Sequence, residues 1–405
     1  MKIGIYMHAR FAPTKGGGFS YQDRLLRRLF RHPRMQASLV LINDGLSGGS
    51  AEPEGFVDFG ARDTVTLRQE EVGLPRRPLL RLRGRQRRWR EECRRRREEY
   101  VLQRMREKEI GLIFYPEQHF LLTEAIPYVI NNWDLAHVTA GFFPDVTVNF
   151  AARQRFYAET MHKAIGVCVE SEAGRRELVR HAGIWEDKIR IVPMFPSELV
   201  DDDPGPEADR QLLEKYALNS RGYFFYPANF WRLKNHYAVL QAFARMESQE
   251  RELVLVGADK GNLDYVLQTA QSLGVERRLK YLGFLQNAEL NTLYRHAIAL
   301  VMPTYLGPTN MPIIEAMALK CPVICSPMAG HVECGQETLS YVRPTDIAGL
   351  SAVMAEHARD PEKASENAER AYQHWRGSAF TIEHASEAMV SALEEFLAVR
   401  KTWGL

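Results

Sequence analysis

Two series of short, apolar and β-branched runs dominate this sequence, and segments with helical spacing separate the runs. Such alternation is typical of βα units that build a parallel sheet. In the first series we expect strands at 2–7, 39–43, 64–67, 111–115, 128–131, 166–170 and 190–193. In the second series we expect strands at 223–226, 253–257, 280–283, 299–303, 322–326 and 340–342. The sequence therefore predicts an α/β protein with two doubly wound sheets.

A segment rich in proline and aspartate, 196–206, separates the two series, and neither helix nor strand continues through it. The length of 405 residues also exceeds the roughly 250–300 at which a single core stops growing. We predict two Rossmann-like domains, at 1–196 and 207–378, joined by a linker at 197–206. Apolar residues at helical spacing in 379–405 predict a last helix that packs back toward the first domain. A ligand would bind in the cleft between the two domains.

The composition is typical of a globular protein that folds in water, with 45% hydrophobic and 26% charged residues. No stretch approaches the ~20 uncharged apolar residues of a membrane span, and residues 1–6 resemble a buried strand rather than a signal peptide. The five cysteines form no CxxC pair, which favours free thiols in a reducing compartment. We therefore expect a cytoplasmic protein.

A cluster of possible zinc ligands comprises Cys321, Cys325, His331 and Cys334. An apolar run that predicts a buried strand separates the first two cysteines, so we expect no metal here.

Positive charge is concentrated in residues 76–109. This segment holds fourteen arginines, one lysine and six glutamates, a net charge of +9, and leaves −7 for the rest of a chain whose total is +2. Three interpretations compete. They are a solvated helix whose glutamates pair with arginines, a contact with anionic lipid headgroups or a lipid-diphosphate acceptor at the inner face of a membrane, and a nucleic-acid patch. No nucleic-acid recognition motif accompanies the charge, so we do not expect nucleic acid as a partner.

Three consecutive glycines, Gly16, Gly17 and Gly18, follow the first expected strand and precede an amphipathic helix. Glycines permit close approach of the backbone to a ligand, and the start of a helix favours an anion. The pattern is neither the GxGxxG of dinucleotide-binding proteins nor a P-loop, so those two functions lose their main support. The alternative is a tight turn without a ligand.

Two loops of the second half carry further polar groups at expected strand ends. Arg232 and Lys234 stand two positions apart, where they could hold a diphosphate or simply decorate the surface. Glu315 lies in the first turn of an otherwise apolar helix, where a carboxylate could accept hydrogen bonds from a ribose or a sugar diol.

These segments, in this order, resemble the GT-B glycosyltransferases of the large retaining family four, which use nucleotide-activated sugars. The resemblance covers nearly the whole chain and rests on 16–18, 170–178, 188–193, 226–236, 283–297 and 312–323. It implies a nucleoside diphosphate sugar as donor, no cofactor and no metal. It also implies transfer of a hexose or deoxyhexose to a glycan or lipid-linked acceptor in surface polysaccharide synthesis.

Carried over position by position, the resemblance implies both parts of the site. The catalytic candidates are His137, Arg232, Lys234 and Asn310. The candidates for binding the nucleotide sugar are Gly16, Gly17, Gly18, Arg232, Lys234, Asn235, Gly283, Phe284, Thr309, Asn310 and Glu315. Glu117 and His119, after another expected strand, are secondary candidates for acceptor contact.

One position departs from the family pattern. Eight positions before Glu315 the family usually has a second glutamate, which contacts the transferred sugar, and this chain has Gly307. We expect Asn310 or the loop backbone to make that contact instead. Three interpretations follow: a retaining glycosyltransferase, an inverting relative of the same fold, and a catalytically silent protein that binds nucleotide or glycan.

Overall fold

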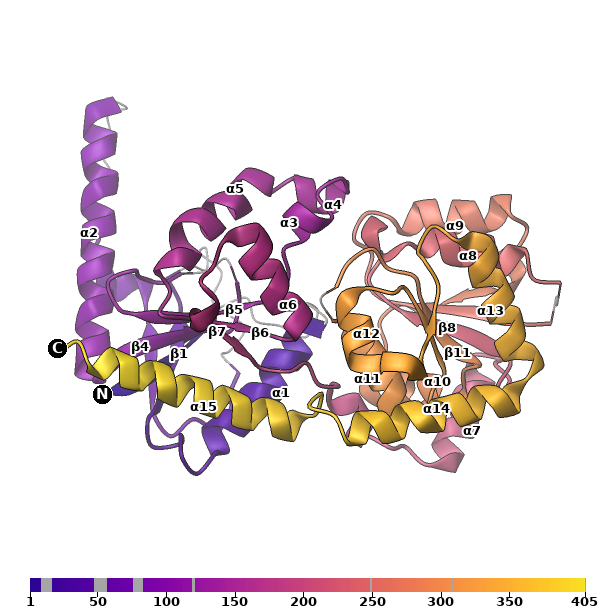
Figure 1. Ribbon diagram of the computed structural model, residues 1–405. Coiled ribbons are helices and arrows are strands. Elements are labelled where there is room, and N and C mark those ends of the chain that lie inside the picture. Colours follow the sequence, from indigo (N-terminus) through magenta and orange to yellow (C-terminus); the bar gives the residue numbers. More distant parts are fainter. Residues whose placement is uncertain are drawn as a thin grey trace.

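Two α/β domains lie side by side in the computed structural model, which describes residues 1–8, 17–46, 57–75, 83–118, 121–247, 250–307 and 309–404 (Figure 1). Each domain contains one parallel sheet, of seven strands in the first and six in the second. Every strand expected from the sequence is present in these sheets. The predicted fold class, two Rossmann-like domains with a helix crossing back, is confirmed.

The first sheet has the strand order β3-β2-β1-β4-β5-β6-β7. Its strands are β1 (Lys2–His8), β2 (Leu39–Asp44), β3 (Thr64–Leu67), β4 (Ile110–Tyr115), β5 (Tyr128–Asn132), β6 (Gly166–Val169) and β7 (Ile189–Ile191). In the parallel register, Ile5 lies between Leu41 on β2 and Phe114 on β4. Helices cover both faces of such a sheet, which explains why the strands are continuous apolar runs.

The helices of the first domain precede or follow these strands. They are α1 (Gly17–Arg31), α2 (Arg83–Glu107), α3 (Ala136–Thr139), α4 (Pro144–Thr147), α5 (Phe150–Arg155) and α6 (Glu172–Glu177). Helix α1 buries Leu25, Leu26 and Leu29 at helical spacing in the core. Helix α2 projects away from the rest of the domain (Figure 1).

The second sheet has the order β10-β9-β8-β11-β12-β13. Its strands are β8 (Tyr223–Pro227), β9 (Glu252–Val256), β10 (Leu279–Tyr281), β11 (Ala299–Met302), β12 (Val323–Cys325) and β13 (Ser340–Tyr341). Its helices are α7 (Pro206–Lys215), α8 (His236–Ala244), α9 (Leu263–Ser272), α10 (Asn287–His296), α11 (Met311–Ala318), α12 (Ala329–Gly335), α13 (Ile347–Arg359) and α14 (Pro361–Arg376). The strand order reverses between β1 and β4 and between β8 and β11, and ligands bind at such reversals.

The last helix, α15 (Ile382–Lys401), returns from the second domain and lies along the first (Figure 1). The ring of Phe396 packs directly on Gly166 of β6, and Arg190 of β7 pairs with Glu395. Arg400 donates a hydrogen bond to the carbonyl of Gly111 over 3.1 Å. The helix therefore ties the end of the chain to the first domain.

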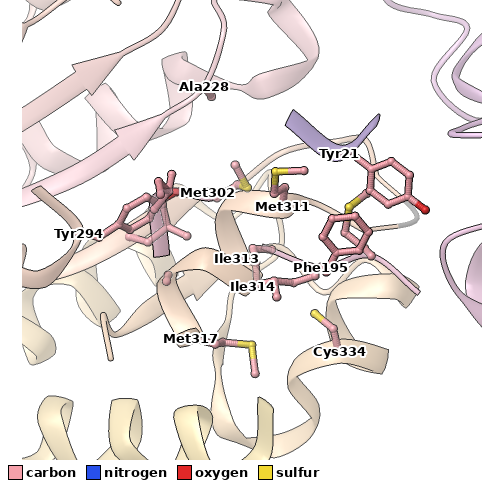
Figure 2. Packing of buried hydrophobic residues seen from close by; sticks show 14 of the residues in the cluster. Tyr21, Phe195, Ala228, Tyr294, Met302, Met311, Ile313, Ile314, Met317 and Cys334 are labelled. Atoms are coloured by element: carbon pink, nitrogen blue, oxygen red, sulfur yellow. The ribbon is translucent and has the colours of Figure 1, made fainter. Parts of the chain in front are cut away.

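One hydrophobic cluster extends through both domains. In Figure 2 the side chains of Met311, Ile313 and Ile314 on α11 lie in the same cluster as Tyr21 of α1 and Phe195. The rings of Tyr21 and Phe195 are stacked with their centroids 4.6 Å apart. Because packed interiors resist deformation, this shared cluster restricts movement of the two domains relative to each other.

Candidate functional site

A cavity of about 900 Å³ lies between the two domains. Its wall is built by segments that follow β5 and β6 of the first sheet and β8, β9 and β11 of the second. These are the carboxyl ends of the strands, where parallel α/β sheets bind ligands. Volumes of this order suit a ligand of nucleotide size.

Gly17 and Gly18 contribute backbone to this wall at the start of α1. A Cβ at either position would meet no atom within 4 Å, so the wall is open at this point. The first amide groups of a helix have no acceptor within the helix, and they favour an anion. Gly16, the third predicted glycine, lies outside the described residues.

Lys234 reaches the cavity from the loop that follows β8. Its Nζ donates a hydrogen bond to Oδ1 of Asn310 over 2.8 Å. Burial lowers the pKa of Lys234 to about 8, and the nearby carboxyl groups of Asp134 and Glu170 oppose this shift. The loop is held by Tyr226, whose hydroxyl donates to the Lys234 carbonyl over 2.5 Å. A fixed cation next to an open cavity is suited to an anionic ligand.

Glu315 lies on the cavity wall in the second turn of α11, not in the first turn as the sequence predicted. One carboxylate oxygen accepts a hydrogen bond from the Ser197 hydroxyl over 2.5 Å, and the other accepts from the Tyr294 hydroxyl over 2.9 Å. Burial raises the pKa of Glu315. The amide N–H of Ser197 also donates to Glu315 over 3.4 Å. A carboxylate has about four lone-pair sites, so these three donors leave acceptor capacity for a hydroxyl group of a ligand.

The loop between β11 and α11 brings Thr309 and Asn310 to the cavity. The amide N–H of Thr309 donates to Glu170 of the first domain over 3.1 Å, so the loop also joins the domains. Phe284, another predicted residue, lines the cavity with an exposed ring. The structure therefore brings Gly17, Gly18, Lys234, Phe284, Thr309, Asn310 and Glu315 to one cavity.

Three predicted residues of the second domain lie outside the wall. The guanidinium of Arg232 pairs with Asp145 of α4 over 2.8 Å and thus connects the two domains. Asn235 is buried, and its Nδ2 donates to two backbone carbonyl groups. Gly257 lies on the cavity wall, and its amide donates a hydrogen bond to the carbonyl of Gly283. Each has a structural role next to the cavity.

His137 also lies behind the wall rather than on it. The side chain is fully buried, its ring stacks on Tyr157 at 4.9 Å, and Nε2 is 2.9 Å from the side-chain oxygen of Gln154. Burial lowers the pKa of His137. His137 is not among the residues that line the cavity, and its catalytic role stays a prediction.

The sequence prediction missed three acidic residues of the first domain that line the cavity, Asp23, Asp134 and Glu170. The last two lie near strand ends. Asp134 pairs with Arg153 over 2.5 Å. Burial raises the pKa of Glu170 to about 8. Asp134 lies three residues after the expected strand 128–131, and Glu170 is the last residue of the expected strand 166–170. Their place at strand ends was the available signal. The secondary candidate Glu117 is not on the wall, and His119 lies outside the described residues.

No three His, Cys, Asp or Glu side chains among the described residues are grouped so that they could hold a metal ion. His331, from the possible zinc cluster, has Nδ1 2.7 Å from the Ser326 carbonyl and Nε2 2.7 Å from Asn310. The cysteines of that cluster are buried free thiols.

Comparison with known proteins shows what this chain resembles. Residues 210–374 match the family "Glycosyl transferases group 1". The whole chain also superposes on a glycosyltransferase from Rickettsia africae ESF-5, with a TM-score of 0.72, 14% identity and 98% of each chain covered. It superposes equally well on Anabaena Alr3699/HepE in complex with UDP-glucose, with a TM-score of 0.71, 16% identity, and 98% of this chain and 100% of that chain covered.

Among curated proteins, the chain is 27% identical over 216 residues to O-antigen chain mannosyltransferase B of Escherichia coli, covering 51% of this chain. The match spans 56% of that relative, about half of its length. The second domain therefore matches the group 1 glycosyltransferases over residues 210–374, and the resemblance to the GT-B glycosyltransferases is confirmed.

Proposed function

We propose that this protein is a glycosyltransferase that moves a hexose or deoxyhexose from a nucleoside diphosphate sugar to a glycan or lipid-linked acceptor in surface polysaccharide synthesis. The observation that carries the proposal is the cavity between the domains, where Lys234, Glu315 and the backbone at Gly17 and Gly18 meet. The similarity to an O-antigen mannosyltransferase and to a structure that contains UDP-glucose supports it.

In this proposal the residues of the cavity divide the work on the donor. Glu315 accepts hydrogen bonds from the ribose, and the Lys234 ammonium binds the diphosphate. When the bond between the anomeric carbon and the diphosphate oxygen breaks, negative charge grows on the leaving group. A fixed cation and the amide groups at the start of α1 stabilise that charge more in the transition state than in the bound donor.

The proposal includes retention of configuration and independence from metal ions. Both follow from the family resemblance, and a lysine and a helix start can neutralise a diphosphate without a divalent ion. An inverting reaction would need a base near the acceptor, and the first domain contributes the carboxyl groups of Asp23, Asp134 and Glu170 to the cavity wall. Analysis of the anomeric configuration of the product by NMR distinguishes the two outcomes.

A thermal-shift screen against UDP, GDP, ADP, TDP, CMP and their sugar conjugates, with and without EDTA, tests the donor site. A ligand that binds the native state stabilises it by about 2.7 kcal/mol at a hundredfold excess over Kd. We expect one nucleotide and its sugar conjugate to raise Tm equally with and without EDTA. A shift that EDTA removes contradicts metal independence.

A second candidate function, a silent nucleotide- or glycan-binding protein, is favoured by Gly307, which replaces the carboxylate that the family usually places near the transferred sugar. Transfer assays with the sugar conjugate found in the screen and a crude lipid extract as acceptor source separate the two functions. If the protein binds the donor but neither transfers its sugar nor hydrolyses it slowly, the silent protein is favoured.

We also propose that α2 binds an anionic membrane surface. Its described part contains ion pairs such as Arg87–Glu91 and Arg96–Glu92, so part of its charge is neutralised within the helix. Arg88, Arg90 and Arg94 make no ion pair with any residue that the structure describes. Helix α2 projects from the first domain (Figure 1), and the side chains of Arg88, Arg90 and Arg94 are exposed. None of the described helices is long and apolar enough to cross a bilayer.

Sedimentation with phosphatidylcholine vesicles that contain or lack phosphatidylglycerol tests this contact. Each cation near an anionic surface is worth about 1 kcal/mol, so the triple variant Arg88→Glu, Arg90→Glu, Arg94→Glu should bind at least ~10-fold more weakly. A control variant reverses the same charge elsewhere, at Arg210, Arg277 and Arg359. Equal binding of both variants would contradict the proposal.

A further inference from the structure

His331 is a buried histidine that lies outside the cavity wall, at the start of α12. Its Nδ1 is 2.7 Å from the carbonyl oxygen of Ser326. A carbonyl oxygen can only accept a hydrogen bond, so Nδ1 must carry the proton. Burial lowers the pKa of His331 to about 4, and the ring is therefore neutral at pH 7. Nε2 is left as an acceptor.

This acceptor fixes the orientation of the Asn310 side chain. Nδ2 of Asn310 lies 2.7 Å from Nε2 of His331 and 3.0 Å from the carbonyl of Leu306, and it donates one proton to each. The amide oxygen of Asn310 must then point the other way. There it accepts the hydrogen bond from Nζ of Lys234 over 2.8 Å. The orientation of one imidazole thus determines what Lys234 meets.

Gly307 provides the space for this arrangement. Its φ is +145°, a conformation that residues with a side chain rarely adopt. A Cβ built on Gly307 would overlap Nδ2 of Asn310. The Asn310 amide therefore fills the space that a side chain at position 307 would need. A glutamate at 307 would displace the amide.

We propose that His331 is a positioning residue that acts through Asn310 to hold the Lys234 ammonium at the cavity wall, in a site where Gly307 has replaced the family's carboxylate. The series Ser326 carbonyl, His331, Asn310 and Lys234 is continuous in hydrogen bonds. A neutral amide orients the lysine without neutralising its charge, so the full cation faces the ligand. The inference rests on the proposed function for its ligand, a nucleoside diphosphate.

A double-mutant cycle tests whether His331 acts through Asn310. Calorimetric titration with the tightest of UDP, GDP and ADP compares His331→Ala, Asn310→Ala and the double variant with the parent protein. Without the imidazole the Asn310 amide is free to turn away from the Lys234 ammonium, so His331→Ala should weaken binding about tenfold. In the Asn310→Ala background the same change should weaken binding less than ~2-fold, because the amide through which His331 acts is already absent.

Two variants control for general destabilisation. His357 is another buried histidine of the second domain whose Nδ1 bonds a backbone carbonyl, and His357→Ala should leave nucleotide binding unchanged. His331→Gln retains one donor and one acceptor and should recover part of the affinity. Equal weakening by His331→Ala in both backgrounds would overturn the inference, and so would unchanged binding in the parent background.

The relay is the hydrogen-bonded series from the Ser326 carbonyl through His331 and Asn310 to Lys234. Nitrogen NMR of 15N-histidine-labelled protein without ligand tests it even if no nucleotide binds. We expect His331 to be neutral with the proton on Nδ1, and both Asn310→Ala and Lys234→Met should move its Nε2 resonance. The His357 resonances should stay in place. A proton on Nε2, or an Nε2 resonance that ignores Lys234→Met, would overturn the relay independently of the donor. A confirmed relay without nucleotide binding would contradict the proposed function alone.

Discussion

The two domains have the same strand order at their centres but use their strand ends differently. In the first domain the cavity wall includes backbone at Gly17 and Gly18 and the carboxyl groups of Asp23, Asp134 and Glu170. In the second it contains an ammonium group, Lys234, and the hydrogen-bonded Glu315. The fold places a ligand between the sheets, but the loops decide its chemistry. The cation that suits a diphosphate comes from the second domain.

Even within one loop the two cations differ. Lys234 points to the cavity and bonds Asn310, whereas Arg232, two residues earlier, bonds Asp145 across the domain boundary. The turn of 3-10 helix over Arg232–Lys234 separates the directions of the two side chains. Two residues that are close in sequence therefore have different roles.

The largest expected effect comes from removing the cavity cation. Lys234→Ala should lower kcat/KM for sugar transfer by roughly 10²–10³, the range seen when one preorganised group that stabilises transition-state charge is lost. Glu315→Ala should also abolish transfer through loss of ribose binding. Steady-state kinetics with the donor from the nucleotide screen measures both.

Arg232→Ala is the matched control for this comparison. Its ion pair with Asp145 is half-exposed on the arginine side, and such pairs typically contribute at most ~1 kcal/mol. We expect less than a tenfold loss of kcat/KM. If Arg232→Ala proves as damaging as Lys234→Ala, the division of roles between these two residues is wrong.

A second prediction concerns how the first domain depends on the end of the chain. In Gly166→Ala the new Cβ would overlap the ring of Phe396, which forces α15 away from β6. Overpacking of this kind typically costs about 1–3 kcal/mol of stability. Gly377→Ala, whose Cβ would lie 3.7 Å from its nearest neighbour, is the control. Equal midpoints of the two variants in urea denaturation would show that α15 is not tightly packed on β6.

The smallest expected effect is a pH dependence of nucleotide binding. The pKa of Lys234 is lowered to about 8 and the pKa of Glu170 is raised to about 8, both mainly by burial. As pH rises through 8 each group loses a proton, so both changes make the cavity more negative. A diphosphate should therefore bind most tightly below pH 8 and several-fold more weakly at about pH 9. Titration calorimetry at constant ionic strength measures the change.

Glu170→Gln separates the two contributions to this profile. The variant retains the titration of Lys234, so its affinity should still fall with pH, but less steeply. Affinity that is flat or rises between about pH 7 and 9 in the parent protein would contradict the assignment of both groups to the binding site.

The fold was predictable because each strand is a continuous apolar run between helical segments. The segment at Tyr223–Pro227, for instance, is both a sequence signal and a buried central strand. The position of the cavity was equally predictable, since the loops that carry Lys234 and Asn310 follow the strands β8 and β11. Such patterns can be recognised in the local sequence without knowing which elements pack against one another.

Side-chain direction was not predictable in the same way. His137 follows a strand like the residues of the wall, but its ring is enclosed by Tyr157 and Gln154, which come from later in the chain. The engagement of Asn310 with His331 likewise depends on two segments 21 residues apart. Such contacts are set by tertiary packing, which a motif read from sequence does not contain.

Amide hydrogen exchange with and without nucleotide tests the central claim most directly, because it locates the bound ligand. Using the nucleotide selected by the thermal-shift screen, we predict slower exchange in the loops at 228–235 and 303–310, with the strongest protection around Lys234 and at the start of α11. The body of α2 should exchange at the same rate in both conditions. Protection confined to surfaces away from these loops would contradict a donor site between the two domains.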